Sequence, residues 1–378
     1  MKTKRNRFGI GPEVSLFTLG TMRAIDSLDQ MYLVVKEACS IGINHIETAP
    51  AYGPAEVFLG KSLRKLNSNG IKPLGDWVIT SKILPDIELS NGKKQIQSIL
   101  QRLGVSKIHN LAIHGLNIPT HLNWALKGDG SQLITWAKEK GLVEQVGFTS
   151  HGSLEIIEQA ITSNQFQFCS LHLHLLDQAR LPLAKKALTQ GMGVMAISPA
   201  DKGGHLHTPS QTLIEDCYPI LPLELAYRFL LGKGVSTLTL GANKIEDFYL
   251  AKKLINSNYP LEETEEIVIH NLLQKTKYRL GETFCGQCRK CLPCPQKVPI
   301  PEILRLRNLA FGLDLKIFAK ERYNLIGQAG HWWDEYDASS CKQCGDCLPR
   351  CPYNLNIPSL LKSTHKELAG TPTRKLWR

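Results

Sequence analysis

Two short cysteine runs near the C-terminus hold eight of the eleven cysteines. The first run reads C-x-x-C-x-x-C-x-x-C-P and the second reads C-x-x-C-x-x-C-x-x-x-C-P. Their members are Cys285, Cys288, Cys291 and Cys294, followed by Cys341, Cys344, Cys347 and Cys351. A C-x-x-C-x-x-C turn lets three thiolates converge on one iron–sulfur cubane, and a fourth cysteine followed by proline reaches the cubane of the other run. The spacing therefore predicts ligands for 4Fe-4S clusters.

The two runs are expected to exchange their last cysteines. One cluster would take the first three cysteines of the first run together with Cys351, and the other would take the first three of the second run together with Cys294. The last gap of the first run has two residues, where the bacterial pattern has three. We therefore expect at least one cluster, and two if the shorter gap is tolerated.

Zinc and disulfides are the competing explanations of these cysteines. A zinc knuckle supplies two thiolates, and tetrahedral zinc has no use for four cysteines in a ten-residue run. Disulfides belong to oxidising compartments, whereas the chain opens MKTKRNRFG without an apolar signal segment. We therefore favour clusters over both, and we expect a soluble, cytoplasmic protein.

Length and charge limit the other functions. The chain has 378 residues, 43% of them hydrophobic, which is enough for two or three domains, and no apolar stretch approaches the ~18 residues of a membrane helix. The net charge is +11, and from Cys285 onward 15 Lys and Arg face 8 Asp and Glu. This basic excess either offsets the negative clusters or docks an acidic electron carrier such as a ferredoxin. No nucleic-acid motif is present, so no nucleic-acid partner is expected.

The first 260 residues alternate short apolar, β-branched runs with helical patterns. The strand-like runs cover residues 14–19, 43–48, 77–81, 108–113, 143–149, 166–175, 193–198 and 235–240. The helical patterns cover residues 28–40, 93–103, 131–140, 154–161, 183–190 and 223–231. Eight such units in roughly 250 residues indicate a (β/α)8 TIM barrel, an α/β fold whose active site lies at the C-terminal ends of the strands.

Four chemically active residues follow successive predicted strands. Glu47 and Tyr52 follow the second strand, Lys82 ends the third and His114 follows the fourth. Because all parallel strands of a barrel open on one mouth, we expect these side chains to converge. A carboxylate, a phenol, an ammonium and an imidazole would then share one site.

This order resembles the aldo/keto reductase superfamily, whose tetrad is Asp, Tyr, Lys and His at these places. Residues 42–49, G-I-N-H-I-E-T-A, look like the family's G-I-N-x-F-D-T-A, and Leu103-Gly104 looks like its R-L-G segment. The resemblance covers about residues 8–255. It implies reduction of a carbonyl or related small-molecule substrate with NADP(H).

The tetrad suits that chemistry. A Tyr with a pKa of ~10 is a poor acid at neutral pH unless a cation stabilises its phenolate. Lys82 would be that cation, Glu47 would keep it charged, and Tyr52 would deliver the proton. His114 would donate to the carbonyl oxygen and orient the substrate.

One tetrad position departs from the family pattern. Glu47 stands where the family has Asp, and its side chain is one methylene longer. A shift of about an ångström in the pairing with Lys82 can cost ~100-fold in rate. The alternative is that Glu47 serves as a structural ion-pair partner in a barrel that no longer turns over.

The resemblance also implies where the nicotinamide would lie. Gly20 and Thr21 follow the first strand, in the segment beneath the ring. Ser150 and His151 stand where the family has a Ser-Asn pair for the carboxamide, so only the serine is kept. These four residues are expected to contact the cofactor.

Polar residues of the sixth predicted strand alternate with leucines. Ser170, His172 and His174 would face the barrel interior. Ser170 and His174 stand where the family has Gln and Asn, and we expect them to bind the cofactor. A metal site at the two histidines is the alternative, although two strand histidines without a third ligand are more often ordinary barrel residues.

Two loops are expected to hold the cofactor's phosphates. Ser198 begins a segment with Lys202 and two glycines that ends the seventh strand, where the family's loop wraps the pyrophosphate. Gly241, Asn243 and Lys244 follow the eighth strand and precede a helix, the usual phosphate position in such barrels. Lys244 would meet a 2'-phosphate and favour NADP(H), unless it is simply a solvated lysine.

The whole chain resembles aldo/keto reductases that carry a C-terminal, α-helical, ferredoxin-like 4Fe-4S module. In that group a short-gap cysteine run is followed by an Ile-Pro segment, here C-P-Q-K-V-P-I-P at 294–301. We expect a barrel over residues 1–260, a linking helix over 261–284 and the cluster domain over 285–378. Between the cysteine runs, the spacing predicts one helix over 303–319.

Joining the two halves poses a chemical problem. Hydride carries two electrons together, whereas each cluster accepts one at a time, so direct exchange needs a flavin or a radical intermediate. We find no flavin signature. One explanation is that the clusters pass electrons from an external carrier to a different reaction step. Otherwise they sense the redox state, or they stabilise the fold of the C-terminal segment. The rival hypothesis is thus a non-catalytic redox sensor on a reductase-like scaffold.

Overall fold

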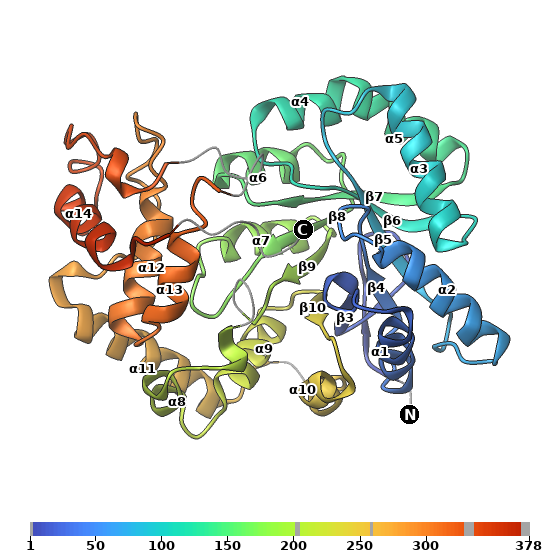
Figure 1. Cartoon of the computed structure of the whole chain (residues 1–378), viewed down its shortest axis with the longest axis horizontal. Coiled ribbons are helices and arrows are strands. Elements are labelled where there is room, and N and C mark those ends of the chain that lie inside the picture. The colour runs from blue at the N-terminus through green and yellow to red at the C-terminus, as the bar shows by residue number, and fades with distance from the viewer. Residues whose placement is uncertain (1–2, 201–204, 258–259, 329–335, 372–378) are drawn as a thin grey trace. The chain divides into compact units, whose positions relative to one another are not determined.

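The computed structural model describes residues 3–200, 205–257, 260–328 and 336–371. The chain forms two compact units (Figure 1). The first comprises Met1–Gly203 and Ala226–Pro260, and the second comprises Gly204–Leu225 and Leu261–Arg378. The second unit therefore includes a segment that interrupts the first in sequence. Within the described ranges, every helix is too short or too polar to span a bilayer.

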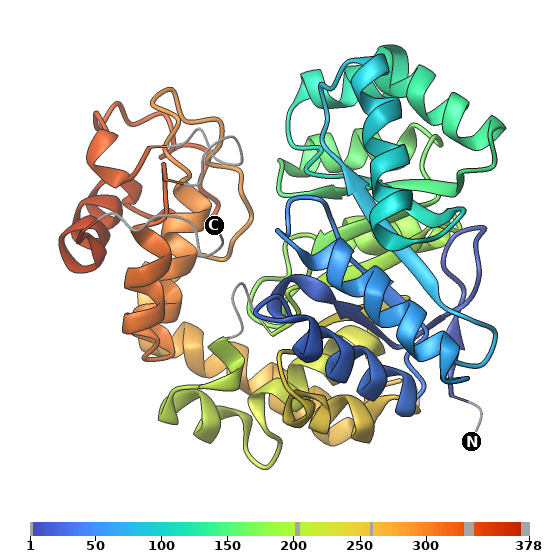
Figure 2. The same cartoon turned by 45° about the vertical axis from the view of Figure 1, so that its right-hand side comes forward.

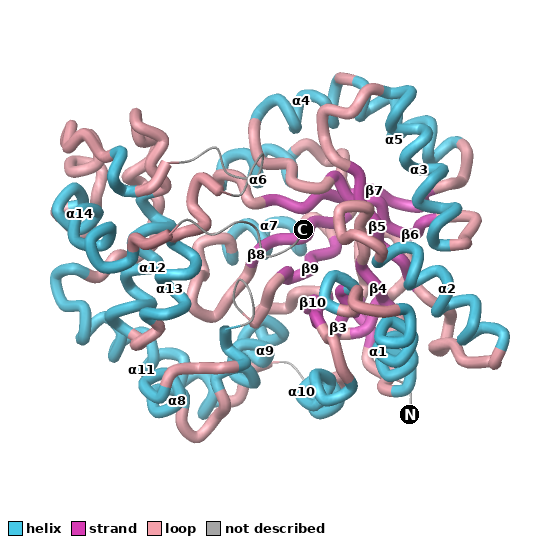
Figure 3. The backbone as a smooth tube through the Cα atoms, viewed as in Figure 1, coloured by secondary structure: helices cyan, strands magenta, loops and turns pink. Residues whose placement is uncertain are grey.

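The first unit is a closed barrel of eight parallel strands surrounded by helices, seen in magenta and cyan in Figure 3. Its strands are β3 (Phe17–Gly20), β4 (His45–Glu47), β5 (Val78–Ile83), β6 (Ile108–Ile113), β7 (Val143–Ser150), β8 (Phe168–His172), β9 (Gly193–Ile197) and β10 (Thr237–Gly241). Each strand pairs with the next along the chain, and β10 closes on β3. The predicted TIM barrel is confirmed.

Helices follow the strands and bury one face against them. They are α1 (Leu28–Ser40), α2 (Ala55–Ser68), α3 (Leu89–Leu103), α4 (Pro119–Lys127), α5 (Asp129–Glu139), α6 (Leu154–Thr162), α7 (Leu181–Thr189), α9 (Pro222–Gly232) and α10 (Tyr249–Leu254). In α1 the buried positions Met31, Val34, Val35 and Ala38 recur at helical spacing. Ser27 precedes the helix and caps it, because its side chain accepts a hydrogen bond from the Gln30 amide.

The predicted first strand is divided. Residues Val14–Ser15 form β2, which pairs antiparallel with β1 (Arg5–Asn6), and the barrel strand starts only at Phe17. The Ser15 hydroxyl donates to the Phe17 carbonyl at 2.6 Å, which stabilises the bend between the two strands. The loop after β1 carries Phe8, whose ring packs 5.3 Å from the ring of His45 and 5.1 Å from that of Phe168.

A polar ladder fills the barrel below the strand ends. His45 contacts the hydroxyls of Thr18 and Thr80 at 2.7 Å each, and the Asn110 amide donates to Thr80 at 2.9 Å. Gln145 in turn donates to Asn110 at 2.6 Å. Burial lowers the pKa of His45 to about 3, so its imidazole is neutral. The ladder fixes the register of the strands that carry the site.

The second unit is helical where the structure describes it. Its helices are α8 (Gln211–Cys217), α11 (Glu263–Leu280), α12 (Ile300–Gly312), α13 (Lys316–Tyr323) and α14 (Ile357–Leu368). Helix α12 packs on α11, α13 and α14 (Figure 2, orange to red). The guanidinium of Arg279 on α11 donates to both carboxylate oxygens of Asp216 on α8, which ties the inserted segment into this unit.

The single helix predicted over 303–319 is wrong, because two helices occupy this region. Asp314 adopts φ = +53°, a left-handed conformation that an α-helix does not contain and that Asp tolerates better than most residues. Leu313 and Leu315 on either side are buried, and the Leu315 amide donates back to the Leu309 carbonyl at 3.0 Å. The turn lets both leucines reach the core, which periodicity alone does not predict.

Candidate active site and cysteine groups

The strand ends bring the four tetrad residues into one mouth of the barrel. Glu47 is the last residue of β4, and its register partners are Gly20 on β3 and Thr80 on β5. Lys82 lies two residues beyond Thr80 and therefore on the same, inward face of β5. The loop after β4 carries Tyr52, and the residue after β6 is His114.

Lys82 is the centre of this group. Its ammonium forms an ion pair with Glu47 and donates to the Tyr52 hydroxyl at 2.8 Å and to the Thr48 carbonyl at 3.0 Å. The Lys82 and Glu47 side chains are 2% and 5% exposed. A buried ion pair is tolerated when its remaining donors are satisfied, and here all three Lys82 donors have acceptors.

Burial acts on the acid–base properties of the site. It raises the pKa of the Tyr52 hydroxyl and lowers the pKa of Lys82. Tyr52 therefore holds its proton at neutral pH. The Glu47 carboxylate in contact with Lys82 favours the charged ammonium and so opposes the effect of burial.

The imidazole of His114 stands edge-on to the Tyr52 ring, with ring centroids 5.9 Å apart and an interplanar angle of 87°. Its backbone amide donates to the Ile83 carbonyl at 2.7 Å, and the next amide, of Gly115, donates to the Thr149 hydroxyl at 2.9 Å. The structure thus brings all four predicted tetrad residues together. A carbonyl oxygen placed beside Tyr52 would meet two polar side chains.

Gly20 and Thr21, which are predicted to contact the cofactor, border the tetrad. A Cβ atom on Gly20 would lie 2.8 Å from the Thr239 methyl and 3.7 Å from the Glu47 carboxylate. The Thr21 hydroxyl lies 3.2 Å from the Glu47 carbonyl and 2.9 Å from the Thr48 hydroxyl. Glycine at position 20 therefore lets the Thr239 side chain of β10 pack closely against β3, and Thr21 braces the segment that carries Glu47.

Ser150 and His151 are placed at the end of β7, but the hydroxyl of Ser150 is largely engaged. It donates to the Leu116 carbonyl at 2.7 Å and accepts from the Gly152 amide at 3.0 Å. One lone pair is left for a ligand. The His151 imidazole lies beside His172, with Nε2 atoms 3.3 Å apart.

On β8, Ser170 faces the interior and is buried, and its hydroxyl has no hydrogen bond among the described residues. The predicted alternation stops at His172, because β8 ends there. His174 lies in the following turn, where it bridges Asp177, and is fully buried. Within the described ranges, no three or more His, Cys, Asp and Glu side chains are arranged to hold a metal ion.

The two predicted phosphate loops differ in what they offer. Ser198 has φ = +53°, a strained conformation that often marks a ligand loop. Lys202 lies outside the described residues. After β10, the amides of Asn243 and Lys244 donate to the Asp247 carboxylate at 2.9 and 3.3 Å. A phosphate would have to compete with that carboxylate for these donors, whereas the Lys244 side chain is exposed.

The barrel sequence matches a known protein family. The model of the aldo/keto reductase family matches residues 17–215, which is more than half of the chain. The chain belongs to this family. It is therefore an oxidoreductase of the aldo/keto reductase type.

Individual relatives agree. An aldo-keto reductase of Bombyx mori is 25% identical over 260 residues, which cover 62% of this chain and 80% of that protein. Its crystal structure, a complex with NADP, has a TM-score of 0.56 at 19% identity and covers 72% of this chain and 93% of that one. The holo form of an aldo-keto reductase from Bacillus halodurans has a TM-score of 0.60 at 19% identity, covering 71% and 95%. These structures share the barrel fold.

Outside the part that the family model covers, the eight run cysteines fall into two groups. Burial raises the pKa of Cys285, and the nearby Cys288 and Cys351 thiols raise it further. Burial also raises the pKa of Cys291, to about 12, and the nearby Cys285 and Cys288 thiols contribute to this rise. Each run thus lies folded on itself, and Cys351 of the second run joins the first.

The second group mirrors the first. Burial raises the pKa of Cys347, with further contributions from Cys341, Cys344 and Cys294. These four cysteines line one hollow, together with Ile300, Pro358 and Leu361. The two groups lie next to each other, because Cys347 of the second group is close enough to Cys291 of the first to raise its pKa.

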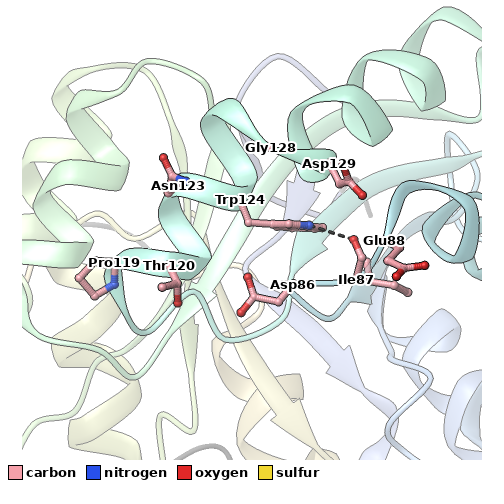
Figure 4. A pocket seen from close by; sticks show the side chains of 9 residues that line it. All are labelled: Asp86, Ile87, Glu88, Pro119, Thr120, Asn123, Trp124, Gly128 and Asp129. Atoms are coloured by element: carbon pink, nitrogen blue, oxygen red, sulfur yellow. Dashed lines mark hydrogen bonds between the residues drawn. The ribbon is translucent and has the colours of Figure 1, made fainter.

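A larger hollow of about 650 Å³ opens beside the barrel mouth (Figure 4). It lies between the loop after β5 and the α4–α5 region, and the indole of Trp124 donates to the Ile87 carbonyl at 2.9 Å across its wall. Its charged lining residues are Asp86, Glu88 and Asp129. None of the tetrad residues lines it.

Sequence reasoning missed two residues near the tetrad. The Thr48 carbonyl accepts from Lys82, and the buried Thr239 hydroxyl on β10 has no hydrogen bond among the described residues. Thr48 follows Glu47 directly in the E-T-A segment, so the sequence indicated that it lies close to the tetrad. Thr239 follows the strand alternation of β10, and its role emerges only from the closure of the barrel.

Proposed function

We propose that this aldo/keto reductase uses NADP(H) to reduce a carbonyl or related small-molecule substrate, with Tyr52 as the proton donor. The observation that carries this proposal is the contact of Lys82 with both Tyr52 and Glu47, at 2.8 Å to the Tyr52 hydroxyl. A cation within hydrogen-bonding distance of a buried phenol stabilises the phenolate that forms when the proton leaves.

The steps follow from the residues at the mouth. Bound NADPH would supply a hydride to the carbonyl carbon. As negative charge builds on the carbonyl oxygen, Tyr52 transfers its proton to it, and Lys82 stabilises the resulting phenolate. His114 orients the oxygen by donating to it. Glu47 holds Lys82 in place and charged throughout, and a proton from solvent restores Tyr52.

The fit of a nicotinamide cofactor rests on an unused polar group at the mouth. The buried Ser170 hydroxyl offers a donor and acceptor with no partner in the described chain. Lys244 is exposed next to the predicted phosphate loop and would pair with a 2'-phosphate. NADP is bound by the Bombyx mori relative, which supports the same choice here.

For the second unit, we propose two 4Fe-4S clusters. One would be held by Cys285, Cys288, Cys291 and Cys351, and the other by Cys294, Cys341, Cys344 and Cys347, as the spacing of the two runs implies. The proximity of Cys351 to Cys285 and of Cys294 to Cys347 supports this division. Four thiolates per group match the ligand number of such clusters, which exchange single electrons. Residues 285–378 would form the cluster domain, with 261–284 as its link to the barrel.

An acidic electron carrier is the proposed partner of this domain. A hollow next to the second cysteine group is lined by Lys297, Lys342 and Tyr336. It shares Pro295, Gln296 and Lys342 with the hollow that the cysteines line. Two lysines beside an exposed cysteine group favour the approach of a negatively charged protein. The clusters would then receive single electrons and supply a step separate from hydride transfer.

The test uses full-length protein purified without oxygen. Iron and acid-labile sulfide are counted, and NADPH oxidation is followed with a panel of aldehydes and ketones for the natural chain and for Tyr52→Phe. The proposal expects carbonyl-dependent oxidation that Tyr52→Phe lowers by about 10²–10⁴-fold. No turnover with any carbonyl by the loaded protein would reject the reductase and leave the redox sensor.

A further inference from the structure

The two cysteine runs contain the same local turn with different surroundings. Each begins C-x-Q-C, and the two glutamines, Gln287 and Gln343, both adopt left-handed conformations, with φ = 57° and 55°. The Gln287 amide donates to the Cys285 sulfur at 3.3 Å. Gln343 is exposed and makes no hydrogen bond within the described part of the chain. The thiol of Cys285 stands here for the thiolate that would bind iron.

Helix α12 fixes the first turn from behind. The Asn308 amide donates to the Cys285 carbonyl at 2.8 Å, and its oxygen accepts from the Cys285 amide at 3.4 Å. One helical position earlier, the guanidinium of Arg307 donates to the Thr283 carbonyl at 3.3 Å. Arg307 is thereby held close enough to Cys285 for the two charges to interact. In the second group, Lys342 and Arg350 line the same hollow as Cys341.

The two cysteine groups also differ in burial. In the first, Cys285, Cys291 and Cys351 are at most 9% exposed, whereas in the second only Cys347 is buried. Reduction adds a negative charge to a cluster, and burial makes that charge more costly. Hydrogen bonds to the ligand sulfurs and nearby positive charge oppose this cost and raise the reduction potential. The side-chain amide of Gln287 thus donates to a sulfur of the group that burial penalises.

We propose that Gln287, assisted by Arg307, raises the reduction potential of the cluster held by Cys285, Cys288, Cys291 and Cys351. This inference rests on the proposed clusters. Because the hydrogen bond and the positive charge offset the cost of burial, the more buried cluster can still accept an electron that enters the protein at the more exposed group. Electrons would cross where Cys347 adjoins Cys291. Gln287 is a positioning and tuning residue and binds no iron itself.

The experiment measures the midpoint potential of each cluster in anaerobically loaded, full-length protein by a redox titration followed by electron paramagnetic resonance. Gln287→Leu removes the amide donor at nearly constant volume, and Gln343→Leu is the matched control in the other run. A Cys344→Ser protein, which lacks a ligand of the exposed cluster, identifies which signal belongs to which group. Iron and sulfide counts are compared for all variants.

Gln287→Leu is expected to lower the potential of the buried cluster only, and Arg307→Met to shift the same signal in the same direction. Gln343→Leu is expected to leave both potentials unchanged. The inference is overturned if Gln287→Leu, with full iron content, shifts neither potential, or if both leucine variants shift their clusters equally. Absence of iron from the natural chain is a different result, because it removes the proposed clusters themselves.

Discussion

The hydroxyl of Tyr52 donates to the carboxylate of Glu47 at 3.3 Å, so the proposed proton donor and the counter-ion of Lys82 are in direct contact. Aspartate, one methylene shorter, is the family's usual residue here. The extra length lets the carboxylate reach the ammonium of Lys82 and, through its Oε1 atom, also the phenol. In the resting site the Tyr52 proton therefore points toward Glu47, and a bound carbonyl must compete for it.

Glu47→Gln tests the role of this carboxylate. Burial lowers the pKa of Lys82, and loss of the adjacent negative charge lowers it further. Reduction needs the charged ammonium, which is present below the pKa of Lys82 and lost as pH rises through it. The basic limb of kcat/KM should therefore move to lower pH, with activity at neutral pH falling by roughly 10²-fold.

Glu47→Asp is the matched control. It keeps the charge but withdraws it from Tyr52, so the basic limb should stay close to that of the natural chain. If the pH profiles of the Gln variant and the natural protein coincide, Glu47 does not set the charge of Lys82, and it is a structural partner only.

Buried His45 is expected to make the stability of the barrel depend on pH. Its pKa falls from 6.5 to about 3 on folding because the imidazole is buried. The unfolded chain therefore binds more protons between these values, and the stability that depends on neutral His45 is lost as pH falls from about 6.5 toward 3. At pH 4.5, two units below the unfolded pKa of 6.5, protonation of His45 in the unfolded chain lowers the free energy of unfolding by roughly 3 kcal/mol.

The measurement is urea unfolding at about pH 7.5 and pH 4.5, followed by circular dichroism. His45→Gln retains hydrogen-bonding atoms for Thr18 and Thr80 but cannot titrate, so its loss of stability between the two pH values should be smaller than that of the natural protein. Equal losses in both proteins would show that other groups dominate the acid response.

Much of the active site could be predicted because strand ends order it. Once eight apolar runs were identified, the polar residues after them had to meet at one mouth, and Glu47, Tyr52, Lys82 and His114 do so. Features that depend on side-chain hydrogen bonds were not predicted. The Asp247 carboxylate that caps the loop after β10 is one example.

The points at which helices and strands end were equally hard to predict from the sequence. The left-handed turn at Asp314 splits an apparently continuous helix, since Asp carries no strong breaking signal. Likewise, the alternation in β8 runs on in sequence to His174, although the strand ends at His172. Both errors arise because periodicity records which side chains are buried and not whether the backbone remains regular. The cluster ligands stay a prediction that chemistry must test.

Lys244→Ala tests the choice of cofactor. An exposed lysine at the predicted 2'-phosphate position contributes about 1 kcal/mol through a solvent-screened contact. The KM for NADPH should rise roughly 5-fold, while that for NADH should not change. Lys140→Ala, an exposed lysine between α5 and β7 at the opposite end of the strands, is the control. An equal rise for NADPH and NADH would place Lys244 away from the 2'-phosphate.

Cys344→Ser tests the cysteine groups separately. Cys344 is exposed, so its loss should disturb folding little, while one of the two clusters loses a thiolate. Iron content measured without oxygen should fall from about eight to about four per chain, because Cys285, Cys288, Cys291 and Cys351 still form a complete set. Cys39→Ser on α1, outside both runs, should leave the iron content unchanged. Complete loss of iron in Cys344→Ser would mean that the two groups assemble as one unit, and zinc in place of iron would rule out the clusters.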